Sequence, residues 1–126
     1  MIKKFIHQFA SPKTYLFQVN KVYRYIFYIS LIIYVFSLTW GLLFTTEDFV
    51  QGNSYRIIYL HVPASFISQS LYAIMAIASI TYLIWRVKLA AYFIIAIAPI
   101  GAMTTFIALI SGSIWGIPTW GTWWQW

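Results

Sequence analysis

The sequence predicts an all-α integral membrane protein in which three transmembrane helices precede a tryptophan-rich segment. The first observation is the composition: 62% of the 126 residues are hydrophobic and only 8% are Asp, Glu, Lys or Arg, whereas a soluble domain has about 25% charged residues. The second is that three uncharged stretches are long enough to cross a hydrocarbon core, which takes about 20 helical residues. The third is that the basic residues lie at the ends of these stretches, as topology determinants do. The net charge of +6 is therefore no sign of nucleic-acid binding.

The uncharged stretches define the elements in order. Residues 25–46 lack any charge, and the longer uncharged stretch 57–85 requires either a tilted helix or first turns at the membrane interface. The third span begins at Leu89, and regular helix is not expected beyond Ile110 because Gly112, Gly116, Pro118 and Gly121 follow. The predicted organisation is a tail (1–24), a helix (25–46), a loop (47–56), a helix (57–85), a loop (86–88), a helix (89–110) and a tryptophan-rich segment (111–126).

The distribution of Lys and Arg predicts the orientation. Seven basic residues lie in the 1–24 tail and the 86–88 loop, against Arg56 alone in the 47–56 loop. Because positive residues accumulate on the cytoplasmic side, we expect the N-terminus there, with the 47–56 loop and the tryptophan-rich segment on the opposite side. The N-terminus lacks the compact apolar region and cleavage site of a removable signal peptide. The absence of cysteine excludes disulfides, thiolate metal sites and C-x-x-C-H attachment of haem within this chain.

Small residues in the third span predict close helix packing. Ala98/Ala102 and Gly101/Thr105 are pairs of small residues four positions apart, a spacing that lets two membrane helices approach closely. Pro99 is expected to kink the span, with neighbouring groups satisfying the freed carbonyl.

His61 is the strongest single candidate for a functional residue, and its environment depends on where the second helix starts. If Pro63 occupies the first turn, the helix starts near Val62 and His61 lies at its cap. If the helix begins near Tyr55, His61 heads a polar face that descends into the bundle. The other residues of that face would be Ser65, Ser68, Gln69 and Tyr72.

Few protein groups are available beside His61. An ionisable residue at membrane depth usually faces a bundle interior or a cavity. No second histidine stands three or four positions away, so a zinc site with three or four protein ligands is poorly supported. A single imidazole is better suited to axial ligation of haem iron. The alternative is an interfacial histidine bonded to water or backbone.

The remaining ionisable residues admit simpler interpretations. Arg56 could anchor to lipid phosphate or pair with an anionic ligand group, and the sequence favours neither. Glu47 and Asp48 are adjacent, lack an accompanying nucleophile and are expected to be solvated loop charges. His7 lies among lysines of the N-terminal tail and is expected to be solvated or at the lipid surface.

Five of the seven tryptophans lie in the last twelve residues, interleaved with glycine and proline. Interfacial enrichment of tryptophan explains one or two of them. A rigid strip of indoles would also form a platform for a large planar ligand, since ring stacking adds about 0.5–1.5 kcal/mol per pair. A cage for a quaternary ammonium is the competing use, weakened because the segment has no carboxylate. The platform residues would be Trp115, Trp120, Trp123, Trp124 and Trp126, with Gly116, Pro118 and Gly121 setting the backbone.

Three separated motifs resemble one known family. The final WGTWWQW is similar to the tryptophan-rich signature of the WWD domain in haem-handling proteins of cytochrome c maturation. Together with FVQGNSYRIIYLHVPAS and APIGAMTTFIALISGSIWG, in this order, it resembles the CcmC family of haem exporter proteins. The resemblance implies a multi-pass protein of the bacterial inner membrane that holds haem b non-covalently and transiently on the periplasmic face. It implies delivery to the haem chaperone CcmE, alongside CcmA, CcmB and CcmD.

The resemblance also assigns residues. The family's first axial histidine falls on His61, and its haem-facing aromatic strip falls on Trp115 to Trp126. The family signature continues with an Asp after the last Trp, and a second axial histidine belongs to a later periplasmic loop. The resemblance therefore implies the N-terminal portion of a larger polytopic bundle.

These observations predict a haem-handling membrane protein rather than an enzyme, with Arg56 as a candidate partner for a haem propionate. Two alternatives remain open: a structural or interaction subunit whose aromatic tail docks a partner, and a non-functional truncated fragment. A small ion or drug transporter is set aside, because the spans 25–46 and 89–110 contain no ionisable side chain of the kind such a protein needs.

Overall fold

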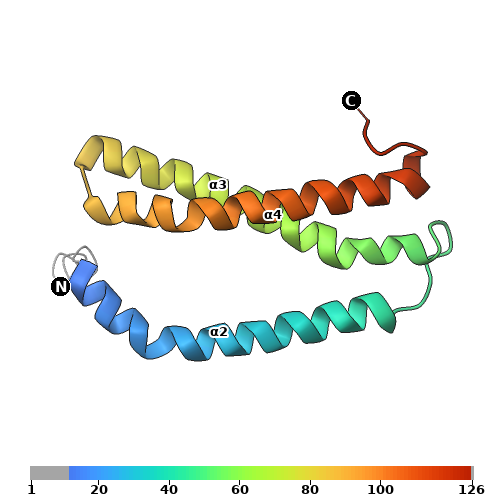
Figure 1. Ribbon diagram of the computed structural model, residues 1–126, viewed down its shortest axis with the longest axis horizontal. Helices are drawn as coiled ribbons and strands as arrows, with labels where there is room; N and C mark the ends of the chain where they lie inside the picture. Colours follow the sequence, from blue (N-terminus) through green and yellow to red (C-terminus); the bar gives the residue numbers. More distant parts are fainter. Residues whose placement is uncertain (1–11, 126) are drawn as a thin grey trace.

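The computed structural model describes residues 12–125, and within this range it consists of three long α-helices and one short 3-10 helix (Figure 1). Three helical stretches are long and apolar enough to cross a membrane: Val22–Leu43, Asn53–Trp85, which includes the short 3-10 helix, and Lys88–Trp120. The predicted all-α membrane class is confirmed. In chain order the elements are α2 (Pro12–Leu43), η1 (Asn53–Ile57), α3 (Ile58–Trp85) and α4 (Lys88–Trp120).

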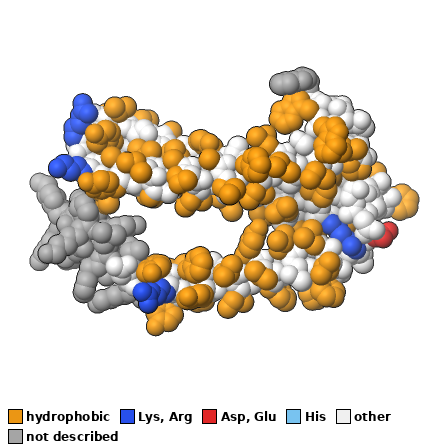
Figure 2. Space-filling model, in the orientation of Figure 1, with side chains coloured by type: hydrophobic (Ala, Val, Ile, Leu, Met, Phe, Trp, Pro, Cys, Tyr) orange, Lys and Arg blue, Asp and Glu red, His pale blue; other side chains and the backbone are white. Residues whose placement is uncertain are grey.

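Hydrophobic side chains cover the lengths of the helices, and on the face in Figure 2 the charged side chains lie towards the two ends. Most large apolar residues are exposed, while Ala64 is the only apolar side chain buried among the described residues. The three spans have mean hydropathies of 2.0, 1.6 and 2.3. Such a surface suits lipid tails, and helices suit a bilayer because they satisfy their own backbone groups.

α3 and α4 form a closely packed antiparallel pair (Figure 1). The small residues predicted to permit close packing do so in part: Gly101 is buried, and a methyl group there would meet Leu71 at 3.9 Å. Thr105, four residues on, shares a hydrogen bond of 2.6 Å with Ser68 of α3. Ala102 is exposed and does not take part.

α2 joins this pair mainly at one end (Figure 1). Gly41 lies against the ring of Tyr59, where a Cβ atom would be only 2.5 Å from Cγ. Arg56 reaches back from η1 to the carbonyl oxygens of Leu42 and Thr45. The first loop and the start of α3 therefore dock onto the C-terminal end of α2.

α4 continues ten residues beyond the end predicted from the sequence, so the expectation that regular helix stops at Ile110 is wrong. Gly112 and Gly116 both lie within the helix, and each faces a neighbouring group that occupies the space a side chain would need. Gly121 ends the helix instead, with a left-handed φ of 75° and an N–H bond of 2.9 Å to the Ile117 carbonyl. At 1.5 Å per residue, 33 residues extend about 50 Å, more than the roughly 30 Å of hydrocarbon. Part of α4 therefore lies outside the hydrocarbon core.

Candidate functional site

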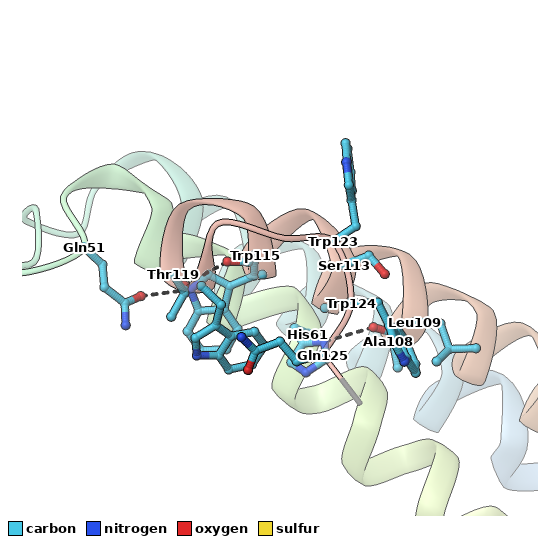
Figure 3. A pocket seen from close by; sticks show the side chains of 13 residues that line it. Gln51, His61, Ala108, Leu109, Ser113, Trp115, Thr119, Trp123, Trp124 and Gln125 are labelled. Carbon is cyan, nitrogen blue, oxygen red and sulfur yellow. Dashed lines mark hydrogen bonds between the residues drawn. The ribbon is translucent and has the colours of Figure 1, made fainter.

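A pocket of about 460 Å³ lies where the C-terminal half of α4, the start of α3 and the first loop meet (Figure 3). Its volume is in the range usual for small-molecule sites. Its walls are mainly apolar and aromatic. The lining residues are Gln51, His61, Ala108, Leu109, Gly112, Ser113, Trp115, Gly116, Thr119, Trp120, Trp123, Trp124 and Gln125.

His61 projects from the second turn of α3 against α4. Pro63 lies inside this helix, which begins at Ile58 directly after η1, so the earlier of the two predicted helix starts is the correct one. The imidazole Nδ1 lies 3.0 Å from the carbonyl oxygen of Ala108 and 3.2 Å from Oγ of Ser111. His61 is thus held by backbone and hydroxyl groups of the facing helix.

The polar face predicted below His61 is present in its upper half. Ser65 Oγ lies 3.5 Å from Nε2 of His61, and Ser68 is buried in its bond with Thr105. Gln69 and Tyr72 are exposed and do not continue the seam. The polar contacts between α3 and α4 therefore stop near the level of Thr105.

Trp115 stands beside the imidazole and connects it with the first loop. The indole and imidazole centroids are 5.8 Å apart at 64°, an edge-to-face arrangement. The indole Nε1–H donates to Gln51 Oε1 at 2.8 Å, as Figure 3 shows. This bond satisfies the single hydrogen-bond donor of the indole and holds its Nε1 edge towards the first loop.

The loop that presents Gln51 is a tight turn centred on Asp48. The Asp48 carboxylate accepts backbone N–H groups of Val50 and Gln51 at 2.9 and 2.8 Å. Both bonds lower the pKa of Asp48 below its ordinary value, and the bond from Gln51 has the larger effect. Asp48 and Gly52 exchange both backbone bonds, and Gly52 supplies the required φ of 58°. Asp48 thus has a structural role in placing Gln51.

The chain after α4 folds back over the helix end. Gly116 lies under this return, since a Cβ there would be 2.9 Å from the Thr122 carbonyl oxygen. Thr122 Oγ1 bonds the backbone of Trp124 in both directions, to the carbonyl at 3.1 Å and from the N–H at 3.4 Å. This reversal brings Trp124 and Gln125 to the pocket wall.

The predicted indole platform is less flat than the sequence implied. Trp115 is half-buried, whereas Trp120, Trp123 and Trp124 are 61%, 62% and 48% exposed. The indole of Trp123 points away from the cluster around His61 in Figure 3. Four predicted tryptophans and Gly116 line the pocket, while Trp126 is outside the described residues.

Other predicted site residues do not line the pocket. Pro118 is exposed within the last turn of α4, and Gly121 forms the helix end. Arg56 donates to Leu42 and Thr45 carbonyls at 3.3 and 2.6 Å and does not line the pocket. Its Nε is buried without a hydrogen-bond partner among the described residues.

Several lining residues were missed by sequence reasoning. Ala108 and Gly112 were missed; together with Gly116, which was predicted, they recur every four residues and so lie on one face of α4. This signal was present in the sequence, but it becomes visible only when helix is extended past Ile110. Gln51 had no comparable signal, because its role depends on the turn formed by Asp48.

The donor set limits the chemistry. Residues 12–125 contain no group of three or more His, Cys, Asp or Glu side chains able to hold a metal ion. Glu47 Oε1 accepts a bond of 2.6 Å from Asn53, so both loop carboxylates contribute to the turn. His7 is outside the described residues. The pocket therefore offers one imidazole among aromatic and apolar walls, which suits a large apolar ligand with a single coordination position.

Comparison with known proteins identifies the family. The family model CcmC, described as "Heme exporter protein C", matches residues 5–126. The chain belongs to the CcmC family. It is therefore a multi-pass membrane protein of a haem-exporter family, as the three apolar helices also indicate.

Curated relatives agree with this assignment. Heme exporter protein C of Escherichia coli K12 is 47% identical over 124 residues, which are 98% of this chain and 50% of the relative. The protein of the same name from Haemophilus influenzae is 42% identical over 123 residues, again 98% and 50%. That of Paracoccus denitrificans is 48% identical over 92 residues, 73% and 38%. The chain spans about half the length of the first two relatives.

Proposed function

We propose that this chain holds haem as transient, non-covalent cargo for cytochrome c maturation. In this proposal the N-terminus and the 86–88 loop are cytoplasmic, because seven of eight basic residues lie there. The pocket then opens at the periplasmic face of the inner membrane. The chain binds and passes on haem b and does not catalyse a reaction.

One observation supports the proposal most: the imidazole of His61 lies in the wall of a pocket lined by four tryptophans. Its Nδ1 is engaged by α4, while Nε2 has only the Ser65 hydroxyl, at 3.5 Å, as a hydrogen-bonding neighbour within residues 12–125. The donor set fits haem, which needs one axial ligand per face and apolar surroundings. Bound iron would supply the coordination site, and the indoles would pack against the macrocycle.

The open walls of the pocket fit a protein that releases its cargo. Trp120 is more than half exposed and could contact both haem and a receiving protein. We propose CcmE as that receiver, with CcmA, CcmB and CcmD as neighbouring subunits. A propionate role for Arg56 would require its guanidinium to leave the α2 carbonyls, so we regard that role as secondary to its structural contacts.

A second function has its own observation. The indole of Trp123 points away from the site and is 62% exposed (Figure 3). Exposed tryptophans are typical anchors in protein interfaces. The segment could therefore dock a partner without binding haem.

Substitution of His61 by Ala tests the proposal. Membranes containing H61A should retain less haem, with an altered absorption spectrum, because the iron loses its ligand. The matched control is H7A, which removes the other histidine of the chain and should leave the spectrum unchanged. If H61A and the unmodified chain had the same spectrum and retention, haem ligation by His61 would be excluded.

The two candidate functions separate at the tryptophans. Changing Trp115 to Phe should disturb the haem spectrum, because it removes the bond to Gln51 beside the imidazole. Changing Trp123 to Phe should change it less, because that indole points away from the cluster around His61. A docking function alone predicts no spectral effect from either change.

A further inference from the structure

We infer that α4 fixes the tautomer of His61, so that the imidazole carries its proton on Nδ1 and offers Nε2 as the ligating atom. Ser111 and Gly112 are thereby positioning residues. The assignment of the proton concerns the chain alone, whereas the ligating role of Nε2 rests on the proposed function.

The first step concerns the Ala108 carbonyl. Its oxygen lies 3.0 Å from Nδ1 and has only lone pairs to offer. A neutral ring with an unprotonated Nδ1 would place two lone pairs against each other. The contact is a hydrogen bond only if Nδ1–H donates to the carbonyl.

The second step concerns the Ser111 hydroxyl, which also approaches Nδ1, at 3.2 Å. Its single hydrogen is directed within α4, to the Ile107 carbonyl at 2.6 Å, with a longer contact to Ala108 at 3.2 Å. Ser111 is buried, so no water competes for this arrangement. The hydroxyl therefore faces His61 as an acceptor, and both neighbours of Nδ1 require the same proton.

The third step concerns Nε2. The neutral Nδ1–H tautomer leaves Nε2 with a lone pair, the form in which imidazole binds metals. The Ser65 hydroxyl, 3.5 Å away, can donate weakly to that lone pair. Ligating histidines usually donate their other N–H to a carbonyl or carboxylate, which fixes the tautomer and the ring orientation.

The fourth step concerns the space for the ring. A Cβ atom on Gly112 would lie 2.7 Å from Cε1 and 3.2 Å from Nδ1 of His61. Any larger residue at this position would push the imidazole away from Ala108 and Ser111. Gly112 therefore allows the contact on which the tautomer depends.

Nitrogen-15 NMR of the chain labelled at histidine, without haem, tests the inference. H7Q leaves His61 as the only histidine, and the spectrum is recorded in lipid bilayers at a pH where the ring is neutral. We expect the proton on Nδ1, opposite to the form that predominates in free histidine. A proton on Nε2 would overturn the inference, whatever the chain does with haem.

Two variants test the positioning roles. S111A should shift both nitrogen resonances towards a tautomer mixture and lower haem affinity about 10-fold, and G112A should lower it about 100-fold. The matched controls are S79A, whose hydroxyl makes the same kind of bond within α3, and G101A, where a Cβ has ordinary contact at 3.9 Å. Resonances unchanged in S111A would overturn the role of Ser111.

The outcomes also separate this inference from the proposed function. A proton on Nδ1 combined with H61A that retains haem normally would disprove haem ligation and leave the tautomer assignment standing. If G112A does not fold, S111A alone decides the matter, because it removes one oxygen and creates no clash.

Discussion

α3 packs against α4 and α2 through different kinds of contact, and the comparison shows which of the two helices positions the pocket residues. Toward α4, α3 makes hydrogen bonds at two levels, from His61 to Ala108 and from Ser68 to Thr105. Toward α2, contact is concentrated near Gly41 and Arg56 (Figure 1). Large apolar side chains of α2 from Val22 to Phe36 are at least 45% exposed. The α3–α4 pair therefore defines the pocket, and α2 is a helix docked at one end.

Among substitutions that test this difference, Gly41→Ala should have the largest effect on stability. The new Cβ would lie 2.5–2.8 Å from three ring atoms of Tyr59, and overpacking of this kind costs about 1–3 kcal/mol. Thermal unfolding in detergent should show the loss, while the haem spectrum stays unchanged because the pocket does not involve α2. A changed spectrum would contradict the separation of the two regions. Adding Tyr59→Ala should relieve the clash.

Arg56→Gln should have the next largest effect. The guanidinium binds two carbonyls at the end of α2 from a half-buried position. An amide cannot span both, and we expect a loss of about 1–2 kcal/mol after allowing for solvent screening. The control is Arg24→Gln, an exposed arginine on α2 that should change stability by less than about 0.5 kcal/mol. Equal losses in both variants would show that Arg56 does not hold α2.

A smaller effect is expected at the lower level of the α3–α4 seam. Ser68→Ala, Thr105→Ala and the double variant form a cycle around the 2.6 Å bond between the two hydroxyls. Hydrogen bonds between membrane helices contribute about 0.6 kcal/mol on average. A coupling energy near zero would show that this seam does not stabilise the pair.

The smallest effect concerns the turn that carries Gln51. Hydrogen bonds lower the pKa of Asp48. The stability that its carboxylate gives the turn is therefore present above the ordinary pKa and is lost as the pH falls through the lowered value. Acidification should therefore release Gln51 from Trp115 and change the tryptophan fluorescence. Asp48→Asn should abolish this pH dependence. A transition of equal size in that variant would assign it to another group.

The fold was largely predictable, because charge-free stretches of this length have few alternatives to membrane helices. The end of α4 was not. Gly112 and Gly116 are helix-breaking signals when considered locally, but they are required by His61 and by the returning chain at Thr122. Contacts between distant residues here override local propensity.

The sequence predicted which residues belong to the site better than it predicted how they are arranged. His61 and four tryptophans were identified by residue type and clustering, and the structure places all of them on one pocket. The sequence did not decide whether Arg56 binds lipid phosphate or an anionic ligand group. Its actual hydrogen bonds depend on how close the end of α2 lies to η1. Gln51 and Ser111 were missed, since a glutamine in a turn and a serine in a helix are ordinary residues until their partners are known.

The most direct test of the central claim is the location of bound haem. The chain has no cysteine, so one introduced cysteine can carry a fluorophore whose emission haem quenches over distance. Val50→Cys places the label in the turn next to Gln51, and Ile84→Cys places it at the far end of α3, and both positions are exposed. Haem should quench the label at position 50 far more strongly than the label at 84, and H61A should abolish the difference. Equal quenching at both positions, as expected for haem dissolved in the bilayer, would contradict the account.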